Sequence, residues 1–292
     1  MNQGKYVFSQ LVKFLPQRVF DRITSNYSGN KSVKHFTCWN QLLCMIFGQL
    51  SARESLRDLT TTIEAHQSKS YHLGFGKNIT RSNLSKANEK RNYKIFEEFA
   101  NHLITIAQRK NSNDTFDIKG NIYAFDSSTI DLCLSVFCWA HFRKTKAGIK
   151  LHTLFDVNTQ IPVFIHITKA NIHDVNAMDV IDYELLAYYI FDRAYVDYQR
   201  LYRITKAKAY FVVRAKSNIK FKRMYSNKVD KTTGIKYDQI GKIEGFYTSK
   251  DYPKRLRKVK FVDSENGKKL VFLTNNFELS AQDIALLYKQ RW

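Results

Sequence analysis

The stretch IYAFDSST, residues 122–129, begins with four apolar residues and places Asp126 where a buried strand would end. A second stretch of the same kind, YYIFD at residues 188–192, ends in Asp192, which lies 66 positions further along the chain. Aromatic and β-branched residues dominate both runs, which is typical of strands. We therefore predict two buried strands that each carry an aspartate at the carboxyl end.

The two aspartates, taken together, indicate a divalent metal site. Hard cations take oxygen ligands, and Mg²⁺ is usually held by one or two carboxylates together with substrate phosphates. Each aspartate alone is better explained as a turn residue that closes its strand. In a strongly basic chain, the pair favours a site for metal-dependent phosphoryl transfer at Asp126 and Asp192.

The charge of the chain indicates a polyanionic partner. Its 292 residues include 47 Lys and Arg against 26 Asp and Glu, a formal net charge of +21. Basic residues are densest at 214–269, with 17 bases against 6 acids, whereas residues 121–213 carry 10 bases and 9 acids. Released counterions drive the binding of basic surfaces to nucleic-acid phosphates. A surface that is merely basic is the alternative.

Zinc, export and membrane functions are not predicted. The four cysteines (Cys38, Cys44, Cys133 and Cys138) form no CxxC pair, and the sequence has no signal peptide, which favours a reducing cytoplasm. The longest apolar run, residues 42–47, is far too short to span a bilayer.

The first 112 residues are predicted to form a helical domain. Apolar residues recur at helical spacing in residues 5–15, 35–49 and 93–108. Ser51, three residues before Glu54, predicts a capping box that opens a further helix. The polar stretch that follows these helices, residues 111–114, is a plausible domain boundary.

A short polar helix is predicted at residues 80–91, with only Leu84 and Ala87 as anchors. Several helices followed by a short polar-basic one are typical of a helix-turn-helix module, which offers the short helix to a DNA groove. In that interpretation the DNA-contacting side chains are those of Arg81, Ser82, Asn83 and Lys86. A solvated surface helix fits the same pattern.

From residue 121 the pattern changes to that of strands. Around the two aspartate strands we predict strands at 149–156, 161–167 and 210–213 and helices at 174–187 and 197–206. This order suggests an α/β sheet in which the first and fourth strands are neighbours, which would bring Asp126 close to Asp192. Lys150, which shares a strand face with His152, either approaches DNA phosphate near the acids or is an ordinary edge residue.

The last third of the chain combines a basic region with a final helix. Residues 214–275 are predicted to form a basic, β-rich insertion with a hairpin turn at Asn266-Gly267, which either grips DNA or consists of solvated hairpins. Ser280 and Asp283 then cap a helix. That helix has no stop signal before Trp292, which predicts a C-terminally truncated chain.

Three segments carry a resemblance to the DDE transposases of bacterial insertion sequences, specifically the insertion-sequence-4 family. Residues 124–128, AFDSS, resemble the family's first catalytic aspartate segment. Residues 191–197, FDRAYVD, resemble its D-R-G-Y-x-D segment, with Ala194 in place of the glycine. Residues 288–291, YKQR, match the start of its Y-x2-R-x3-E-x6-K signature.

The resemblance implies an α/β, ribonuclease H-like catalytic domain at 121–292, incomplete at its C-terminus, preceded by a helix-turn-helix-like DNA-binding domain at 1–112. It implies a bacterial, nucleoid-associated DNA transposase that binds insertion-sequence ends and uses two Mg²⁺ or Mn²⁺ ions, held by Asp126 and Asp192, to cleave and join strands. The partners would be double-stranded DNA, as terminal inverted repeats and as target, and a second copy of the chain in a synaptic homodimer. The residues that would contact DNA are Arg193, Tyr288 and Arg291.

The third carboxylate of the family's signature would follow Trp292. We therefore expect these 292 residues to bind DNA and to cleave it weakly or not at all. Two other functions stay open. One is a non-catalytic derivative that occupies element ends and represses transposition, and the other is a ribonuclease H-like nuclease unrelated to transposition.

Overall fold

The computed structural model describes residues 6–69, 73–75, 79–110, 118, 120–132, 141–143 and 146–290, with the backbone alone at 110, 131–132, 141–143 and 146–147. Residues 1–110 and 111–292 form two compact units. In the described ranges, the first unit is helical and the second contains one large sheet. The chain is therefore a mixed α/β protein with its helical part at the N-terminus.

The helices of the first unit share one apolar core. Phe20, Leu43, Leu84 and Phe99 lie in this core with almost no exposed surface. The predicted helices are present, although their ends differ from the predicted ones. The elements are α1 (Val7–Val12), α2 (Gln17–Asn26), α3 (Cys38–Leu50), α4 (Leu56–Ala65), the 3-10 turn η1 (Gln67–Lys69), α5 (Arg81–Lys90) and α6 (Lys94–Lys110).

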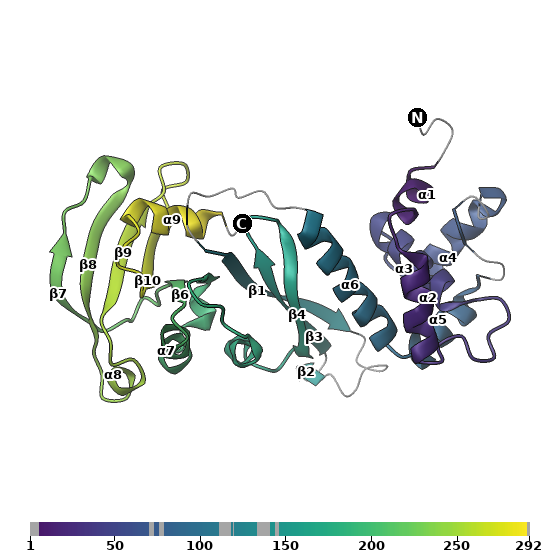
Figure 1. Cartoon of the computed structure of the whole chain (residues 1–292), viewed down its shortest axis with the longest axis horizontal. Helices are drawn as coiled ribbons and strands as arrows, with labels where there is room; N and C mark the ends of the chain where they lie inside the picture. The colour runs from purple at the N-terminus through teal and green to yellow at the C-terminus, as the bar shows by residue number, and fades with distance from the viewer. Residues whose placement is uncertain are drawn as a thin grey trace. The chain divides into compact units, whose positions relative to one another are not determined.

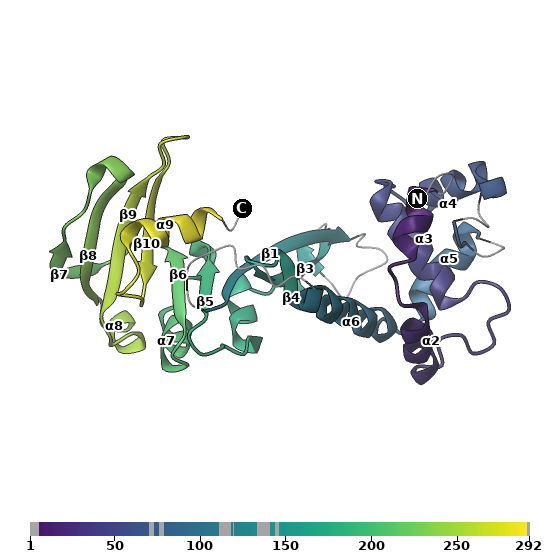
Figure 2. The same cartoon turned by 45° about the horizontal axis from the view of Figure 1, so that its top comes forward.

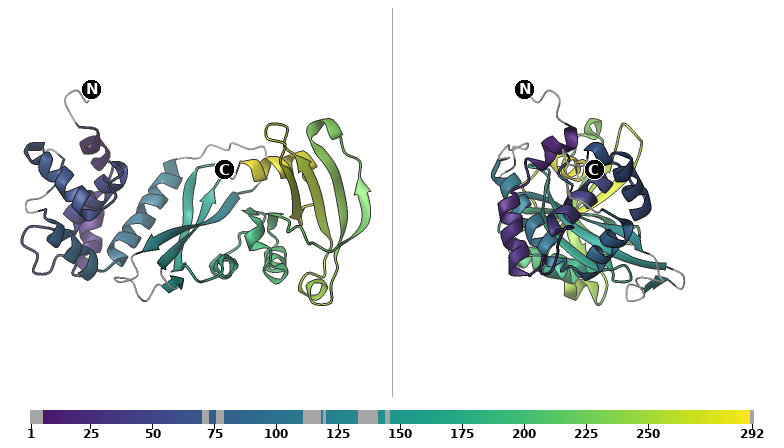
Figure 3. Two further views of the ribbon diagram at one scale, coloured as in Figure 1. Left: turned by 180° about the vertical axis from the view of Figure 1, so that it is seen from behind. Right: turned by 90° about the vertical axis from the view of Figure 1, so that its right-hand side faces the viewer.

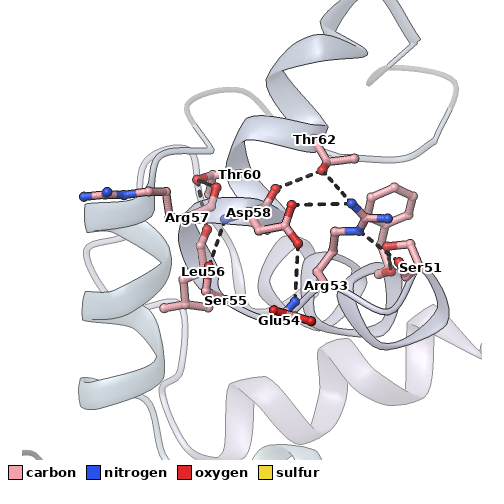
Figure 4. Close-up of polar contacts among 10 residues, drawn as sticks. Ser51, Arg53, Glu54, Ser55, Leu56, Arg57, Asp58, Thr60 and Thr62 are labelled. Carbon is pink, nitrogen blue, oxygen red and sulfur yellow. Dashed lines mark hydrogen bonds and ion pairs between the residues drawn. The ribbon is translucent and has the colours of Figure 1, made fainter.

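The predicted capping box of Ser51 and Glu54 is wrong. Ser51 is the residue that ends α3, and Ala52 then adopts the left-handed conformation with φ +52°. The cap of α4 is Ser55, whose side chain accepts a hydrogen bond of 3.1 Å from the backbone N–H of Asp58 (Figure 4). Both serines stand three residues before an acid, so the spacing alone does not distinguish them.

The predicted short polar helix is present as α5. The Thr80 hydroxyl caps it by accepting a 3.1 Å hydrogen bond from the Asn83 N–H. Leu84 and Ala87 are buried in the core. Residues 66–80 connect α4 to α5, so the two helices are not joined by the three- or four-residue turn of a helix-turn-helix motif.

The second unit is built on one mixed sheet. Its strands are β1 (Ile122–Leu132), β2 (His141–Arg143), β3 (Lys146–Asp156), β4 (Ile161–Lys169), β5 (Tyr188–Phe191), β6 (Tyr210–Arg214), β7 (Phe221–Asn227), β8 (Ile235–Ile243), β9 (Leu256–Val262) and β10 (Lys269–Thr274). Their order is β2-β3-β1-β5-β6-β10-β9-β8-β7, and β4 also pairs with β3 (Figure 1).

The predicted adjacency of the two aspartate strands is confirmed. β1 and β5 are parallel neighbours, with Ala124 opposite Ile190. β6 continues the parallel part of the sheet, whereas β3 and β4 follow β1 as antiparallel partners. All four residues of β5 are buried, as expected for a parallel strand covered on both faces.

The two faces of the sheet pack against different helices. The helix α7 (Tyr198–Lys206) and the 3-10 segment η3 (Asp174–Val180) cover one face, together with Phe125 and Tyr189. The helix α9 (Ala281–Lys289) covers the other face, where it meets Ala124 and Ile190 (Figure 2). The short elements η4 (Arg193–Tyr195), η5 (Lys231–Thr233) and α8 (Thr248–Asp251) complete the unit.

The predicted helix at 174–187 is wrong beyond its first half. Only Asp174–Val180 is helical, and Leu186 has φ +62°, which no right-handed helix accommodates. The Tyr189 hydroxyl accepts a 2.9 Å hydrogen bond from the Glu184 N–H and so stabilises the non-helical path. None of the helices in the described ranges has the length and apolar character needed to cross a membrane.

The basic region forms an antiparallel meander, β7 to β10, that continues the sheet beyond β6 (Figure 3, yellow and light green). The predicted hairpin is confirmed, since β9 and β10 pair across a turn in which Gly267 has φ +67°. Most side chains of the edge strand β7 are exposed. The insertion therefore extends the central sheet with basic residues at its edge.

Candidate active site

Asp126 and Asp192 lie on neighbouring parallel strands at the same level. Ala124 is opposite Ile190, so the same register continued by two residues places Asp126 beside Asp192. Side chains alternate between faces, and both acids therefore share the face of Ala124 and Ile190, which α9 covers. Neighbouring strands are about 4.8 Å apart. The structure thus brings the two predicted catalytic residues together.

The prediction that Asp126 ends its strand is wrong, because β1 continues to Leu132. Both acids instead stand where the buried part of a strand ends. Residues 122–125 are buried, whereas Asp126 is partly exposed and lies opposite Thr153 of β3. Asp192 directly follows β5, is also partly exposed and forms the N-cap position of η4. Their carboxylates therefore lie between an apolar core and solvent.

Tyr288 connects the helix α9 to this site. Its hydroxyl donates a hydrogen bond of 3.1 Å to Oδ1 of Asp192, and its ring packs against Phe272 with 4.8 Å between ring centroids. The side chain is only 6% exposed. The predicted contact of Tyr288 with DNA phosphate stays a prediction; in the structure its hydroxyl binds a carboxylate of the acid pair.

The helix α9 is fixed at both ends. The predicted capping box is confirmed, because Ser280 accepts a 3.0 Å hydrogen bond from the Asp283 N–H and donates one of 2.7 Å to its carboxylate. Asp283 is thus a cap residue. At the other end, Nζ of Lys289 lies 3.1 Å from Oδ1 of Asp263. These contacts fix the position of α9, the helix that carries Tyr288 to Asp192.

A buried ion pair anchors the start of α9 to the meander. Arg257 of β9 donates two hydrogen bonds, of 2.9 and 2.8 Å, to the carboxylate of Asp238 on β8. The same guanidinium donates a 2.6 Å hydrogen bond to the carbonyl of Leu279, just before the helix. The insertion therefore positions the helix that supports the acid pair.

The segment after Asp192 presents one cation to solvent. Arg193 is exposed on η4, immediately next to the acid. Asp197, the last acid of the segment, caps α7 by accepting a 2.9 Å hydrogen bond from the Arg200 N–H. Arg200 also binds Asp179 over 2.6 Å, and this hydrogen bond lowers the pKa of Asp179. Asp197 is therefore a structural residue, whereas Arg193 is free to meet a ligand.

Lys150 does not lie beside the acids. It stands opposite Thr129 on β1, an odd number of residues from Asp126, and so on the other face of the sheet. Its Nζ is 2.9 Å from Oδ1 of Asp174 and donates a 2.7 Å hydrogen bond to the Ile172 carbonyl. The predicted position of Lys150 beside the acids is therefore wrong, and its contact with DNA stays a prediction.

His152 lies on the same face as Lys150 and is fully buried. Its Nε2 is 2.8 Å from the hydroxyl of Thr168, and its ring stacks at 6.2 Å on Phe125. Burial lowers the pKa of His152. This histidine is part of the support beneath β1 and does not face solvent.

The acid pair has the chemistry of a Mg²⁺ or Mn²⁺ site. Two carboxylates side by side, partly exposed, supply the hard oxygen ligands that these cations take, and one or two protein carboxylates are usual where phosphate completes the shell. Among the described residues no group of three or more His, Cys, Asp or Glu side chains is placed to hold an ion.

Two of the four predicted DNA-contacting residues of α5 line a groove in the first unit. The groove, of about 660 Å³, lies between α5 and residues 27–36. Asn83 and Lys86 line it, and Arg91 closes one end by donating a 2.9 Å hydrogen bond to the Thr37 carbonyl. Burial lowers the pKa of Arg91. Arg81 and Ser82 are exposed on the same helix.

Sequence reasoning missed three groove residues, Lys31, His35 and Lys90. Lys31 comes from a loop without periodicity, and His35 was expected to begin a helix that in fact begins at Cys38. Only the fold places these two residues opposite α5. Lys90 ends α5 and was within reach of the helical pattern. Arg291, a further predicted DNA contact, lies outside the described residues.

Comparison with known families decides the identity of the second unit. The model of the Transposase DDE domain family matches residues 118–292, which is more than half of the chain. The chain belongs to the transposase DDE domain family. A second family model, a domain of unknown function (DUF4372), matches residues 3–76. The resemblance to insertion-sequence DDE transposases is confirmed at this level.

Two curated relatives of this DDE family member carry transposase names. One, provisionally named transposase y4zB, from Sinorhizobium fredii (strain NBRC 101917 / NGR234), is 30% identical over 213 residues, which cover 72% of this chain and 58% of the relative. The other, from Geobacillus stearothermophilus, is provisionally named as the transposase for insertion sequence element IS5377. It is 31% identical over 179 residues, 57% of this chain and 44% of the relative. The chain spans about half the length of these relatives.

One solved structure is similar at a lower level. It is a piggyBac transposase in a synaptic complex with hairpin DNA, with a TM-score of 0.43 and 13% identity. The similarity covers 87% of this chain and 55% of that chain.

Proposed function

We propose that the second unit is the ribonuclease H-like core of a DNA transposase that cleaves and joins strands by metal-dependent phosphoryl transfer. This proposal rests on one observation: Asp126 and Asp192 lie side by side on the same face of neighbouring parallel strands. Membership of the DDE family supports the reaction class. The three antiparallel strands followed by two parallel ones support the fold.

Asp126 and Asp192 hold Mg²⁺ or Mn²⁺ in this proposal. The bound metal would activate a water or a 3′-hydroxyl and stabilise the leaving oxygen. Tyr288 keeps the Asp192 carboxylate in one orientation through its 3.1 Å hydrogen bond. Arg193, exposed beside Asp192, neutralises a DNA phosphate at the same edge.

The DNA partner is bound by both units. In the first unit, α5 and the groove that contains Lys31, Lys86 and Lys90 bind DNA backbone. In the second, the exposed Lys222 and Arg223 of β7 continue a basic edge. We propose double-stranded element ends and target DNA as the ligands and a homodimer as the form that holds two ends.

Plasmid nicking tests the catalytic proposal. The full chain is incubated with supercoiled plasmid and Mn²⁺, and nicked circles are scored beside the Asp126→Asn and Asp192→Asn variants. The proposal is supported if the parent nicks the plasmid, even slowly, only with Mn²⁺, and if each of the two substitutions abolishes this nicking. Nicking that survives in both variants contradicts the proposal.

A second candidate function is a DNA binder without chemistry that occupies element ends. The exposed cations of the groove and of β7 favour it, because they bind phosphate without any metal. The same assay separates the two candidates. Plasmid binding without nicking, unchanged by Asp126→Asn and by chelation of divalent ions, supports the second.

A further inference from the structure

A pocket of about 790 Å³ opens in the second unit at a distance from the acid pair. It lies between α7, β7 and the turns that precede β9 and follow β10. Lys208, on its wall, comes just before β6 begins, whereas Asp192 comes just after the neighbouring β5 ends. Tyr252 of the pocket packs in the core on the α7 face, opposite the face of the acids. The pocket is therefore separate from the metal site.

The walls of this pocket are positively charged. Lys206, Lys208, Lys254 and Arg255 all line it, and all four are exposed. No acidic residue is among the residues that line it. None of the four cations forms an ion pair with an acid in the described part of the chain. A ligand with phosphate groups would supply the missing negative charge.

Aromatic rings share the pocket with these cations. Tyr225 and Phe277 are 47% and 46% exposed. Tyr202 and Tyr252 lie deeper, in edge-to-face contact at 5.4 Å, and Tyr252 is held by a 2.8 Å hydrogen bond to Thr205. The pocket thus has two exposed rings, Tyr225 and Phe277, and two rings packed against each other beneath them, Tyr202 and Tyr252.

We propose that this pocket is a second DNA site, which takes an unpaired nucleotide of a DNA strand. The base would stack on Tyr225 or Phe277, and the flanking phosphates would meet the lysines and Arg255. Aromatic platforms interleaved with cations are how proteins bind single strands without sequence preference. The proposal rests on the proposed DNA-binding function and adds the strand state of the ligand.

The size of the pocket and the exposed rings favour a single strand over a duplex. A pocket of this volume accommodates one ligand of nucleotide size, whereas a duplex is too wide to enter it. In a duplex both faces of each base are already stacked on neighbours, so the rings of Tyr225 and Phe277 would gain nothing. An unpaired base offers a free face to each ring.

Fluorescence anisotropy with the full chain tests this site. The probes are a labelled 15-nucleotide oligothymidylate, a 15-base-pair duplex, and free thymidine monophosphate as competitor. We expect Tyr225→Ala and Phe277→Ala each to weaken oligothymidylate binding about tenfold, with duplex binding changed less than twofold. Lys254→Gln should weaken oligothymidylate binding and reduce its salt dependence.

Two matched variants outside the pocket serve as controls. Tyr93→Ala removes an exposed ring from the first unit, and Lys236→Gln removes an exposed charge from β8. Equal losses in controls and pocket variants, or equal effects on duplex and single strand, would overturn the proposal. So would competition by free thymidine monophosphate at the affinity of the oligonucleotide. Metal binding at Asp126 and Asp192 is measured separately. A wrong proposal for the pocket can therefore be distinguished from a wrong proposal for the metal site.

Discussion

The hydroxyl of Tyr288 on α9 donates a hydrogen bond of 3.1 Å to Oδ1 of Asp192, a residue 96 positions earlier in the chain. The bond fixes one carboxylate of the acid pair from the helix that covers it. Partners that orient metal ligands typically change metal affinity by 10- to 100-fold when they are removed. The two residues therefore act as one unit.

Tyr288→Phe should weaken Mn²⁺ binding about tenfold. The ring stays packed against Phe272, but the Asp192 carboxylate loses the hydrogen bond from the tyrosine hydroxyl. Titration calorimetry with the full chain measures the effect. Tyr252→Phe is the matched control, since it removes a hydroxyl that bonds Thr205 far from the acids. Equal Mn²⁺ affinities in parent and Tyr288→Phe would show that the hydroxyl does not support the site.

Arg257→Met should lower the free energy of unfolding by about 3–5 kcal/mol, because it leaves the buried carboxylate of Asp238 without its cation. Urea unfolding measures the loss. The double variant Arg257→Met with Asp238→Leu removes both charges and should recover much of the stability. If Arg257→Met alone is as stable as the parent, this ion pair does not anchor the helix.

The stability of the second unit should depend on pH through His152. Burial lowers its pKa in the folded protein, whereas an unfolded histidine titrates at about 6.5. Between these two values the unfolded chain binds more protons, so the free energy of unfolding falls as pH drops below about 6.5. His152→Gln should reduce the loss between pH 8 and pH 5, measured by urea unfolding. An unchanged pH dependence would contradict this assignment.

Ser55→Ala should destabilise the first unit by about 1 kcal/mol, because α4 loses the side chain that caps it. Ser51→Ala is the comparison, since Ser51 ends α3 and donates only to the Phe47 carbonyl. Thermal or urea unfolding of both variants ranks the two serines. A larger loss of stability for Ser51→Ala than for Ser55→Ala would instead support Ser51 as the cap of α4.

The acid pair was predictable because the information is local. Each aspartate follows an apolar run, at the start of β1 for Asp126 and along β5 for Asp192, and the order of elements makes these strands neighbours. The hydrogen bond from Tyr288 was not predictable in the same way. The motif marks Tyr288 as important, but only the packing of α9 on the sheet brings its hydroxyl to Asp192.

Errors arose where one pattern had two physical solutions. Ser51 and Ser55 both precede an acid by three residues, and the end of α3 decides between them. Lys150 carries a charge suited to phosphate, but the alternation of its strand turns it toward Asp174. Residues 174–187 have helical spacing, but hydrogen bonds from a neighbouring strand hold their second half in another conformation.

Iron-directed cleavage of the protein itself is the most direct test of a metal held jointly by Asp126 and Asp192. Fe²⁺ takes the place of Mg²⁺, and ascorbate with hydrogen peroxide then produces radicals that cut the backbone next to the bound ion. We predict cuts near residue 126 and near residue 192 in the same sample, both lost in Asp126→Asn and both lost in Asp192→Asn. Cuts at only one of the two strands, or cuts that survive either substitution, would contradict a shared metal site.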